Sequence, residues 1–341
     1  MSAERRTSET VLVTGAAGFI GLHLTRALLD RGSRVIAIDN YRTGSRAGLA
    51  GLVAGYPSTQ SLVIEHDITE PLPDWMICDK IVNLACPASP KHYGRDPLDT
   101  LWASVLGSVH LLDLALDLGG IPLLQASTSE VYGDPILSPQ SEDLPGLVDT
   151  MNERACYFEG KRTAEVLCDL YRQLRPQGVS TRIARIFNSY GPGMLPDDGR
   201  VVSSFICQAL AGQPLTVYGD GSHTRSLCHV SDTVRGLLAM VDYEGEIDYP
   251  VNIGNPDEIT IKDLALEISA LVAPGREPLI QYGPLPNGEP TRRCPDIARA
   301  VSVLGWKPAI PRSAGLAQTV EWFRALRSEP IPVPTLTVVG E

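Results

Sequence analysis

Tyr157 and Lys161 are the two side chains in this sequence best suited to acid–base chemistry. They are four residues apart in a segment that we expect to be helical, so both would project from one helix face. An ammonium group near a phenol favours the phenolate, which can remove a proton from a hydroxyl group while a hydride leaves the same carbon. The pair alone is a weak signal, because Tyr and Lys occur at this spacing by chance.

A glycine-rich segment near the N-terminus predicts a phosphate-binding turn. Val11–Thr14 is typical of a buried strand, and an apolar helix pattern begins at Ile20. Between them, Gly15, Gly18 and Gly21 recur at three-residue spacings. A strand that leads into a helix through such a turn directs backbone N–H groups and the positive helix end at a phosphate. The glycines allow the tight turn, the close approach of a pyrophosphate and the packing of helix on strand, so the segment predicts a dinucleotide site.

The next strand indicates which dinucleotide binds. Arg34–Ile38 is followed by Asp39, about 20 residues after the glycines, where a carboxylate binds the 2′-OH of the adenosine ribose. The same carboxylate repels a 2′-phosphate, so we predict NAD rather than NADP, with Lys161 near the nicotinamide ribose. Asp67 follows another short strand, Leu62–Glu65, and either meets the adenine amino group or forms a turn.

Composition and charge exclude several other classes of protein. The chain has 341 residues, 43% of them hydrophobic and 20% charged, as in a globular protein with one large domain or two intimate ones. A net charge of −11 argues against a general nucleic-acid binder. The seven cysteines include no C-x-x-C pair, which predicts free thiols in a reducing compartment and no metal site. The polar N-terminus and the short apolar runs predict a cytoplasmic protein without a signal peptide or a membrane span.

The chain resembles the extended short-chain dehydrogenase/reductase family and, within it, the UDP-glucuronate decarboxylases. The resemblance covers about residues 10–328, and the motifs that carry it are G-A-A-G-F-I-G, A-C-P-A-S-P, S-T-S-E-V-Y-G-D-P, R-A-C-Y-F-E-G-K-R, R-I-F-N-S-Y-G-P, D-G-R-V-V-S-S-F, L-T-V-Y-G-D-G-S-H-T-R and R-R-C-P-D-I. It implies an NAD-dependent enzyme that oxidises UDP-glucuronate at C4, releases CO₂ and reduces the 4-keto intermediate to UDP-xylose. Oxidation places a ketone β to the C6 carboxylate, and the enolate left by CO₂ must be stabilised at the C4 oxygen.

The resemblance also implies roles for individual catalytic residues. Thr128 is the hydroxyl group beside Tyr157, whereas Ser129 and Glu130 take part in decarboxylation. Related dehydratases carry Asp-Glu at these two positions, and related 4-epimerases carry small residues. Arg293 corresponds to the family arginine that meets the sugar carboxylate; the alternative is an ordinary surface arginine.

Further contacts are implied in the same way. The cofactor contacts are Gly15, Gly18, Phe19, Ile20, Gly21, Asp39, Asn40, Thr43, Gly44, Asp67, Ile68, Leu84, Ala85, Tyr157 and Lys161. The UDP-sugar contacts are Ala88, Tyr93, Arg154, Asn188, Arg200, Tyr218, Arg225 and Arg293. The arginines among them supply the cations that a diphosphate needs.

Several positions depart from the family pattern, and they leave the exact nucleotide sugar open. These positions are Asn83, Cys86, Ser104, Phe158, Gly193, His223, Cys228 and His229. A nucleotide-sugar 4-epimerase or 4,6-dehydratase on the same scaffold is the nearest alternative. A catalytically inactive NAD-binding regulatory protein is an alternative from another class.

Alternating strand and helix patterns predict an α/β fold with a doubly wound parallel Rossmann sheet and a smaller C-terminal α/β substrate-binding region. We expect an NAD-binding domain at residues 1–188 and a mainly nucleotide-sugar-binding domain at 189–330, which could return a strand and a helix to the sheet. Residues 331–341 would form a tail. The expected helices near 98–118 and 154–175 are candidates for the contact of a homodimer.

Overall fold

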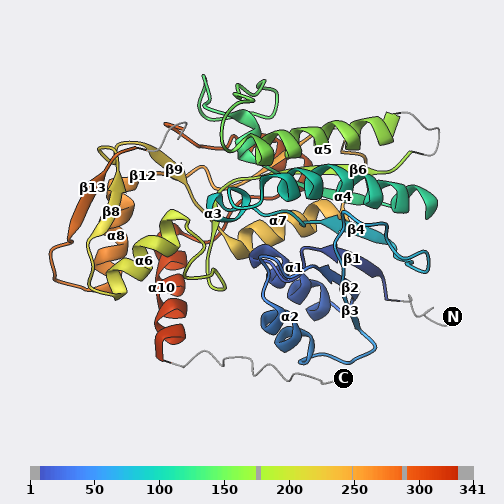
Figure 1. The fold of residues 1–341 in the computed structure, drawn as a ribbon, viewed down its shortest axis with the longest axis horizontal. Coiled ribbons are helices and arrows are strands. Elements are labelled where there is room, and N and C mark those ends of the chain that lie inside the picture. Colours follow the sequence, from blue (N-terminus) through green and yellow to red (C-terminus); the bar gives the residue numbers. More distant parts are fainter. Residues whose placement is uncertain (1–7, 174–177, 248, 286–289, 329–341) are drawn as a thin grey trace.

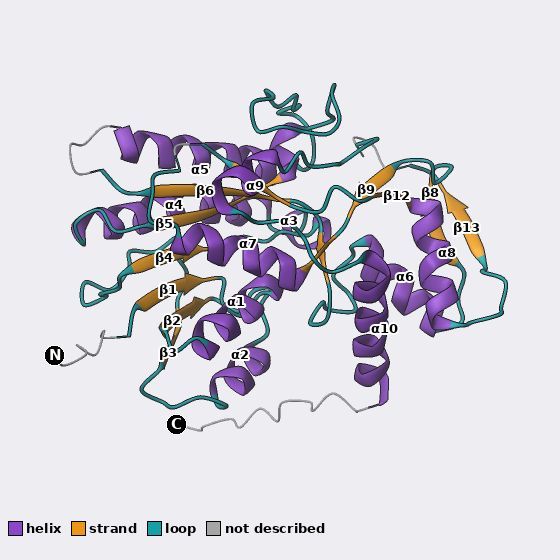
Figure 2. Ribbon diagram, turned by 180° about the vertical axis from the view of Figure 1, so that it is seen from behind, coloured by secondary structure: helices purple, strands orange, loops and turns teal. Residues whose placement is uncertain are grey.

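The centre of the computed structural model, which describes residues 8–173, 178–247, 249–285 and 290–328, is a seven-stranded parallel sheet (Figures 1 and 2). The strand order is β11-β6-β5-β4-β1-β2-β3. The strands are β1 (Thr10–Thr14), β2 (Arg34–Asp39), β3 (Ser61–Glu65), β4 (Lys80–Asn83), β5 (Leu123–Thr128), β6 (Thr181–Ile186) and β11 (Val251–Ile253). The predicted doubly wound α/β fold is confirmed, whereas the expected tail at 331–341 lies outside the described residues.

The strand order reverses between β1 and β4. From β1 the sheet continues to β2 and β3 on one side, and from β4 it continues to β5, β6 and β11 on the other. In open parallel sheets the carboxyl ends of the strands form a crevice at such a switch point, and ligands bind there.

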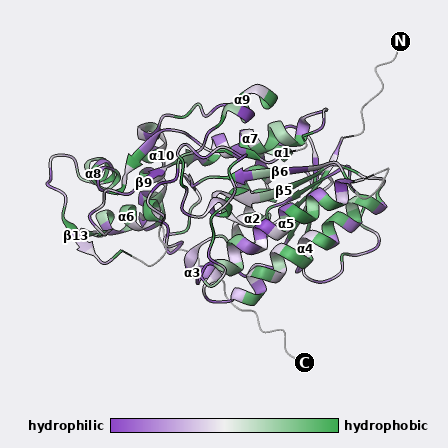
Figure 3. Cartoon of the chain, turned by 90° about the horizontal axis from the view of Figure 1, so that it is seen from above, coloured by the Kyte–Doolittle hydropathy of each residue, from purple (hydrophilic) through white to green (hydrophobic). Residues whose placement is uncertain are grey.

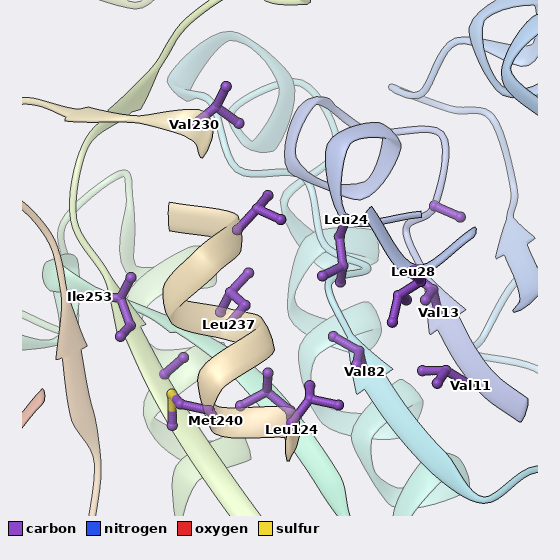
Figure 4. Packing of buried hydrophobic residues seen from close by; sticks show 14 of the residues in the cluster. Val11, Val13, Leu24, Leu28, Val82, Leu124, Val230, Leu237, Met240 and Ile253 are labelled. Carbon is purple, nitrogen blue, oxygen red and sulfur yellow. The ribbon is translucent and has the colours of Figure 1, made fainter. Parts of the chain in front are cut away.

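Helices cover both faces of the sheet. One face carries α1 (Phe19–Asp30), α2 (Arg46–Val53), α7 (Val230–Asp242) and α9 (Ala298–Leu304), and the other carries α4 (Pro97–Asp117) and α5 (Ala155–Gln173). Val11 and Val13 of β1 pack in the first layer with Leu28 and Leu237 (Figure 4), and Leu12 between them packs in the second. This alternation along the strand makes the sheet apolar on both faces, as a parallel sheet between two helix layers requires.

The remaining C-terminal elements form a second core beside the sheet. They are β7 (Ser189–Tyr190), α6 (Val201–Leu210), β8 (Leu215–Tyr218), β9 (Thr224–Ser226), β10 (Cys228–His229), β12 (Glu258–Thr260), α8 (Ile261–Val272), β13 (Ile280–Gly283) and α10 (Arg312–Ser328). Phe205, Leu264 and Phe323 pack together at its centre. None of the described helices has the length and apolarity that a membrane span requires.

Candidate active site

A cavity of about 570 Å³ lies where the carboxyl ends of the central strands meet the C-terminal elements. Gly15, Leu84 and Thr128 line it from the ends of β1, β4 and β5. Phe205 of α6 and Tyr218 of β8 line its opposite side. Its volume is in the range of sites that bind small molecules and cofactors.

The glycine turn between β1 and α1 leaves room for a pyrophosphate. Gly15 has a φ of +67°, and a Cβ there would lie 2.8 Å from the backbone of Leu84 and Ala85. A Cβ at Gly21 would lie 2.0 Å from the carbonyl oxygen of Gly15. Helix α1 follows Gly18, which has no side chain to cap the first N–H groups, and the first residues of the helix, Phe19 and Ile20, line the cavity. These residues fit the phosphates of NAD.

Asp39 ends β2 beside this turn, with its side chain nearly buried. Its two carboxylate oxygens accept hydrogen bonds from the backbone N–H groups of Ala17 (2.9 Å) and Tyr41 (2.8 Å). Burial raises the pKa of the Asp39 carboxyl, although both hydrogen bonds act in the opposite direction. The remaining lone pairs of a carboxylate at this strand tip suit a ribose hydroxyl group.

Helix α5 carries Tyr157 and Lys161 on the face that packs against β5. The Tyr157 ring stacks on the Tyr93 ring with centroids 5.1 Å apart and an interplanar angle of 9°. Lys161 Nζ donates a hydrogen bond to the carbonyl of Ala126 at 2.9 Å. Both side chains line the cavity, and the backbone contact fixes the direction of the ammonium group.

The surroundings of Tyr157 raise the pKa of its phenol in this arrangement. Burial raises the pKa of the phenol above its ordinary value, and the nearby Cys86 and Glu130 groups add to the rise. A hydrogen bond with Thr128 lowers the pKa by less. The expectation that Lys161 would lower this pKa below its ordinary value is therefore not met, because burial, Cys86 and Glu130 raise the pKa by more than the hydrogen bond with Thr128 and the charge of Arg200 lower it.

Glu130 and Arg293 form an ion pair in the cavity wall. Arg293 Nη1 lies 3.4 Å from Glu130 Oε1, and the two side chains are only 8% and 14% exposed. The Nε of Arg293 is buried and has no hydrogen-bond partner among the described residues. By contrast, the neighbouring Arg292 is 53% exposed and pairs with Glu258 at 2.7 Å. Arg293 is therefore a buried cation with capacity left to bind an anion.

Two further arginines lie toward the C-terminal side of the cavity. Arg200 Nη2 donates to the carbonyl of Ala88 at 3.3 Å, and Arg225 Nη1 donates to the carbonyl of Pro290 at 3.0 Å. Both arginines line the cavity together with Asn188, which follows β6. Their positive charge suits a diphosphate.

The cavity brings together most of the residues predicted from the sequence. Those that line it are Gly15, Gly18, Phe19, Ile20, Gly21, Thr43, Leu84, Ala88, Thr128, Glu130, Arg154, Tyr157, Lys161, Asn188, Arg200, Tyr218, Arg225 and Arg293. Those that are described but do not line it are Asp39, Asn40, Gly44, Asp67, Ile68, Ala85, Tyr93 and Ser129.

Some of the residues outside the lining contact residues that belong to it: Asp39 accepts a hydrogen bond from Ala17, and Tyr93 stacks on Tyr157. Asn40 Nδ2 donates to Asp67 Oδ2 at 2.9 Å, which joins the segments after β2 and β3. Ser129 is buried in the 3₁₀ turn Ser129–Tyr132 (η1), directly before the lining residue Glu130.

Several cavity residues did not emerge from the sequence. Two of them, Gln208 of α6 and Thr216 of β8, form two hydrogen bonds with each other. Gln208 Nε2 donates to the Thr216 hydroxyl oxygen at 3.1 Å, and the Thr216 N–H donates to Gln208 Oε1 at 3.0 Å. Their sequence spacing carries no signal, because only the packing of α6 on β8 brings them together. His223 also lines the cavity, two residues before Arg225; the sequence marked it only as a departure from the family pattern.

Comparisons with known proteins agree with this geometry. The profile of the NAD dependent epimerase/dehydratase family matches residues 11–254. UDP-glucuronic acid decarboxylase 1 of Danio rerio is 45% identical over 92% of this chain and 72% of its own length, and UDP-glucuronic acid decarboxylase 6 of Arabidopsis thaliana is 47% identical over 92% and 88%. The structure of UDP-glucuronic acid 4-epimerase from Bacillus cereus in complex with UDP-glucuronic acid and NAD is 28% identical, with a TM-score of 0.81 over 93% of this chain and 99% of that one. The resemblance to extended short-chain dehydrogenases/reductases is thus confirmed, and the chain belongs to the NAD dependent epimerase/dehydratase family.

Proposed function

We propose that this protein is an NAD-dependent UDP-glucuronate decarboxylase that forms UDP-xylose through a 4-keto intermediate. The observation that carries the proposal is the buried Glu130–Arg293 pair, which lies in the same cavity as Tyr157 and Thr128. Arg293 offers a cation to a sugar carboxylate, and an acid and a phenol are available for proton transfer. The relatives named UDP-glucuronic acid decarboxylase support the same assignment.

The side chains in the cavity divide the proposed reaction between them. Bound NAD supplies the hydride acceptor for C4 and later the hydride donor. Tyr157 in its phenolate form takes the proton of the C4 hydroxyl and becomes a phenol, and Arg293 orients the C6 carboxylate β to the new ketone. When CO₂ leaves, the electron pair of the C5–C6 bond forms an enolate, and Tyr157 and Thr128 donate hydrogen bonds to its oxygen. A proton from solvent is added to C5 when the enolate returns to the ketone. As C4 is reduced again, Tyr157 returns its proton to the C4 oxygen, which gives the pentose and restores the phenolate.

The test is incubation of the purified protein with NAD and UDP-glucuronate, followed by measurement of CO₂ and the sugar nucleotide product. We expect CO₂ and a UDP-pentose in equal amounts. A product that keeps all six sugar carbons would reject decarboxylation and favour the 4-epimerase or dehydratase alternative. Tyr157→Phe separates an enzyme from an inactive NAD-binding protein, because loss of this acid–base group should lower turnover by roughly 10²- to 10⁴-fold.

We further propose that residues 1–188 bind NAD, that residues 189–330 mainly bind the nucleotide sugar, and that the enzyme works in the cytoplasm. The glycine turn lies in the first segment, whereas Arg200, Tyr218 and Arg225 lie in the second.

The proposed location in the cytoplasm is supported by the cysteines. All seven are free thiols, as expected in a reducing compartment. Cell fractionation tests the location.

A homodimer is also part of this proposal, with α4 and α5 as the contact. These helices pack side by side (Figure 3), and their outer surface exposes Leu98, Trp102 and Leu106 of α4 with Val166 and Leu170 of α5. An apolar patch of this kind is typical of an interface. Light scattering of the wild-type protein should give twice the monomer mass. Trp102→Glu places a charge in the apolar patch, so this variant should have the mass of a monomer. The matched control is Trp75→Glu, which alters an exposed tryptophan elsewhere and should leave the mass unchanged.

A further inference from the structure

A second buried ion pair lies behind the cavity, between α5 and β6. The guanidinium of Arg185 meets both carboxylate oxygens of Glu165, with Nη2–Oε2 and Nε–Oε1 distances of 2.7 and 3.0 Å. The side chains are only 13% and 11% exposed, and neither is among the described residues that line the cavity. Buried ion pairs are often no more stabilising than apolar side chains of similar volume, so stability alone does not account for this one.

Glu165 continues the row of reactive side chains on α5. Tyr157, Lys161 and Glu165 are spaced four residues apart and share one helix face. Lys161 Nζ donates to the carbonyl of Ala126, and the hydroxyl of Ser127 donates to Glu165 Oε1. Successive turns of α5 are therefore attached to successive residues of β5.

Arg185 extends this attachment to the turn that carries Glu130. Its guanidinium lies over the ring of Tyr132, 4.8 Å from the centroid, and donates to the carbonyl of Glu142 at 3.1 Å. Tyr132 is the last residue of η1, and its hydroxyl donates to Asn252 Oδ1 at 2.8 Å. Arg185 therefore contacts both elements that supply reactive groups, α5 through Glu165 and η1 through Tyr132.

We propose that Arg185 and Glu165 are positioning residues that hold α5 and η1 at the spacing the reaction needs, so that Tyr157 and Glu130 face the same substrate. The inference rests on the proposed function for the reaction itself. A bidentate guanidinium–carboxylate contact fixes orientation as well as distance, and a single hydrogen bond does not. Small displacements of catalytic groups lower the rate steeply, so loss of the pair should act on turnover rather than on binding.

The first test compares Glu165→Gln with Glu267→Gln. The control breaks a half-buried contact between Arg312 and Glu267 of α8 (3.0 Å), neither of which is among the described residues lining the cavity. We expect Glu165→Gln to lower kcat by roughly 10- to 100-fold, with KM for UDP-glucuronate and the rise in Tm caused by NAD nearly unchanged. The control should lower Tm and keep kcat. An unchanged kcat in Glu165→Gln, or a change confined to KM, would overturn the inference.

A double variant separates positioning from simple stability. Glu165→Leu with Arg185→Met removes both charges, so it should fold, because no unpaired buried charge remains. We expect the Tm of the double variant to be higher than that of Glu165→Gln and near the wild-type value. Its kcat should stay low, since the bidentate contact is missing. Recovery of kcat together with Tm would show that the pair only avoids a buried charge, and would reject the inference.

Hydrogen exchange tests the positioning role without measuring turnover, so its result does not depend on the proposed reaction. In the NAD-bound protein, Glu165→Gln should speed exchange in residues 155–161 and 129–132, and Glu267→Gln should not. A wild-type protein that releases no CO₂ would reject the proposed function and leave this exchange result standing. Equal exchange in both variants would reject the positioning role whatever the reaction.

Discussion

Two adjacent arginines, Arg292 and Arg293, have opposite surroundings and therefore opposite expected effects on activity. Arg293 is buried against Glu130 in the cavity wall, and Arg292 forms a surface pair with Glu258. We predict that Arg293→Met lowers the rate of CO₂ release by roughly 30-fold or more, because truncating one partner of a buried charge pair costs about 2–5 kcal/mol. Arg292→Met should leave the rate nearly unchanged, since Arg292 is not among the described residues that line the cavity and its exposed pair with Glu258 adds little to stability. Similar rates for the two variants would place the sugar carboxylate elsewhere.

Asp39 combines a structural role with the choice of cofactor. Its carboxylate accepts hydrogen bonds from the backbone N–H groups of Ala17 and Tyr41, and it places a negative charge beside the glycine turn. We predict that Asp39→Ser weakens NAD binding and narrows the preference for NAD over NADP, because repulsion of a 2′-phosphate is lost. The rise in Tm with each dinucleotide measures both effects. The variant without ligand should lose about 1–3 kcal/mol of stability through its unpaired N–H groups, and an unchanged preference would contradict the cofactor role.

At the scale of elements, the packing of α1 on β1 depends on the absence of one side chain. A Cβ at Gly21 would lie 2.0 Å from the carbonyl oxygen of Gly15, an impossible contact with rigid backbone. Gly21→Ala should therefore displace the N-terminus of α1, lower Tm and abolish NAD binding, as calorimetry would show. Gly51→Ala on α2 is the control, because its Cβ would meet no heavy atom of the described residues within 4 Å. That variant should gain up to about 1 kcal/mol and bind NAD normally; normal binding by Gly21→Ala would contradict the phosphate role of the turn.

Local pattern predicted the elements that position the site, because period and glycine spacing are local properties. The helices expected near 98–118 and 154–175 are Pro97–Asp117 and Ala155–Gln173, and the strand expected at Leu62–Glu65 is Ser61–Glu65. What local pattern could not give is contact between distant segments. The stacking of Tyr93 on Tyr157 depends on one short helical turn, α3 (Pro90–Tyr93), placed by tertiary packing.

Motif resemblance and glycine spacing supplied the lining residues with acid, base or phosphate-binding roles, among them Glu130, Tyr157 and Arg293, because motifs preserve which side chains face the ligand. It carried no information on how those side chains contact each other. The Arg185–Glu165 contact joins β6 to α5, and no spacing in the sequence marks it. The rise in the pKa of Tyr157 likewise depends on burial and on Cys86 and Glu130 from other segments, so the Y-x-x-x-K spacing alone led to the opposite direction.

At the scale of the whole molecule, two histidines lie where the sheet meets the C-terminal elements. His23 of α1 donates from Nε2 to the carbonyl of Pro192 at 2.8 Å, and the ring of His229 packs edge-on against Tyr190 with centroids 5.6 Å apart. The Nε2 of His229 is buried without a hydrogen-bond partner in the part of the chain that the structure describes. Burial lowers the pKa of both histidines below the ordinary value of 6.5; it is opposed by Pro192 at His23 and by Asp232 at His229.

These lowered pKa values predict that acid weakens the junction. Below a pH of about 6.5 the histidines of the unfolded chain bind protons that those of the native protein do not. The free energy of unfolding therefore decreases as the pH is lowered, by up to about 1.4 kcal/mol per histidine and pH unit. Urea unfolding at pH values of about 7.5 and about 5.5 measures the loss. His229→Asn keeps an acceptor for the N–H of Ser231 at the start of α7 but does not titrate, so its loss of stability in acid should be smaller. Carboxyl groups titrate alike in both proteins and cancel in the comparison, so an equal loss in the wild type and the variant would show that His229 takes no part in the acid response.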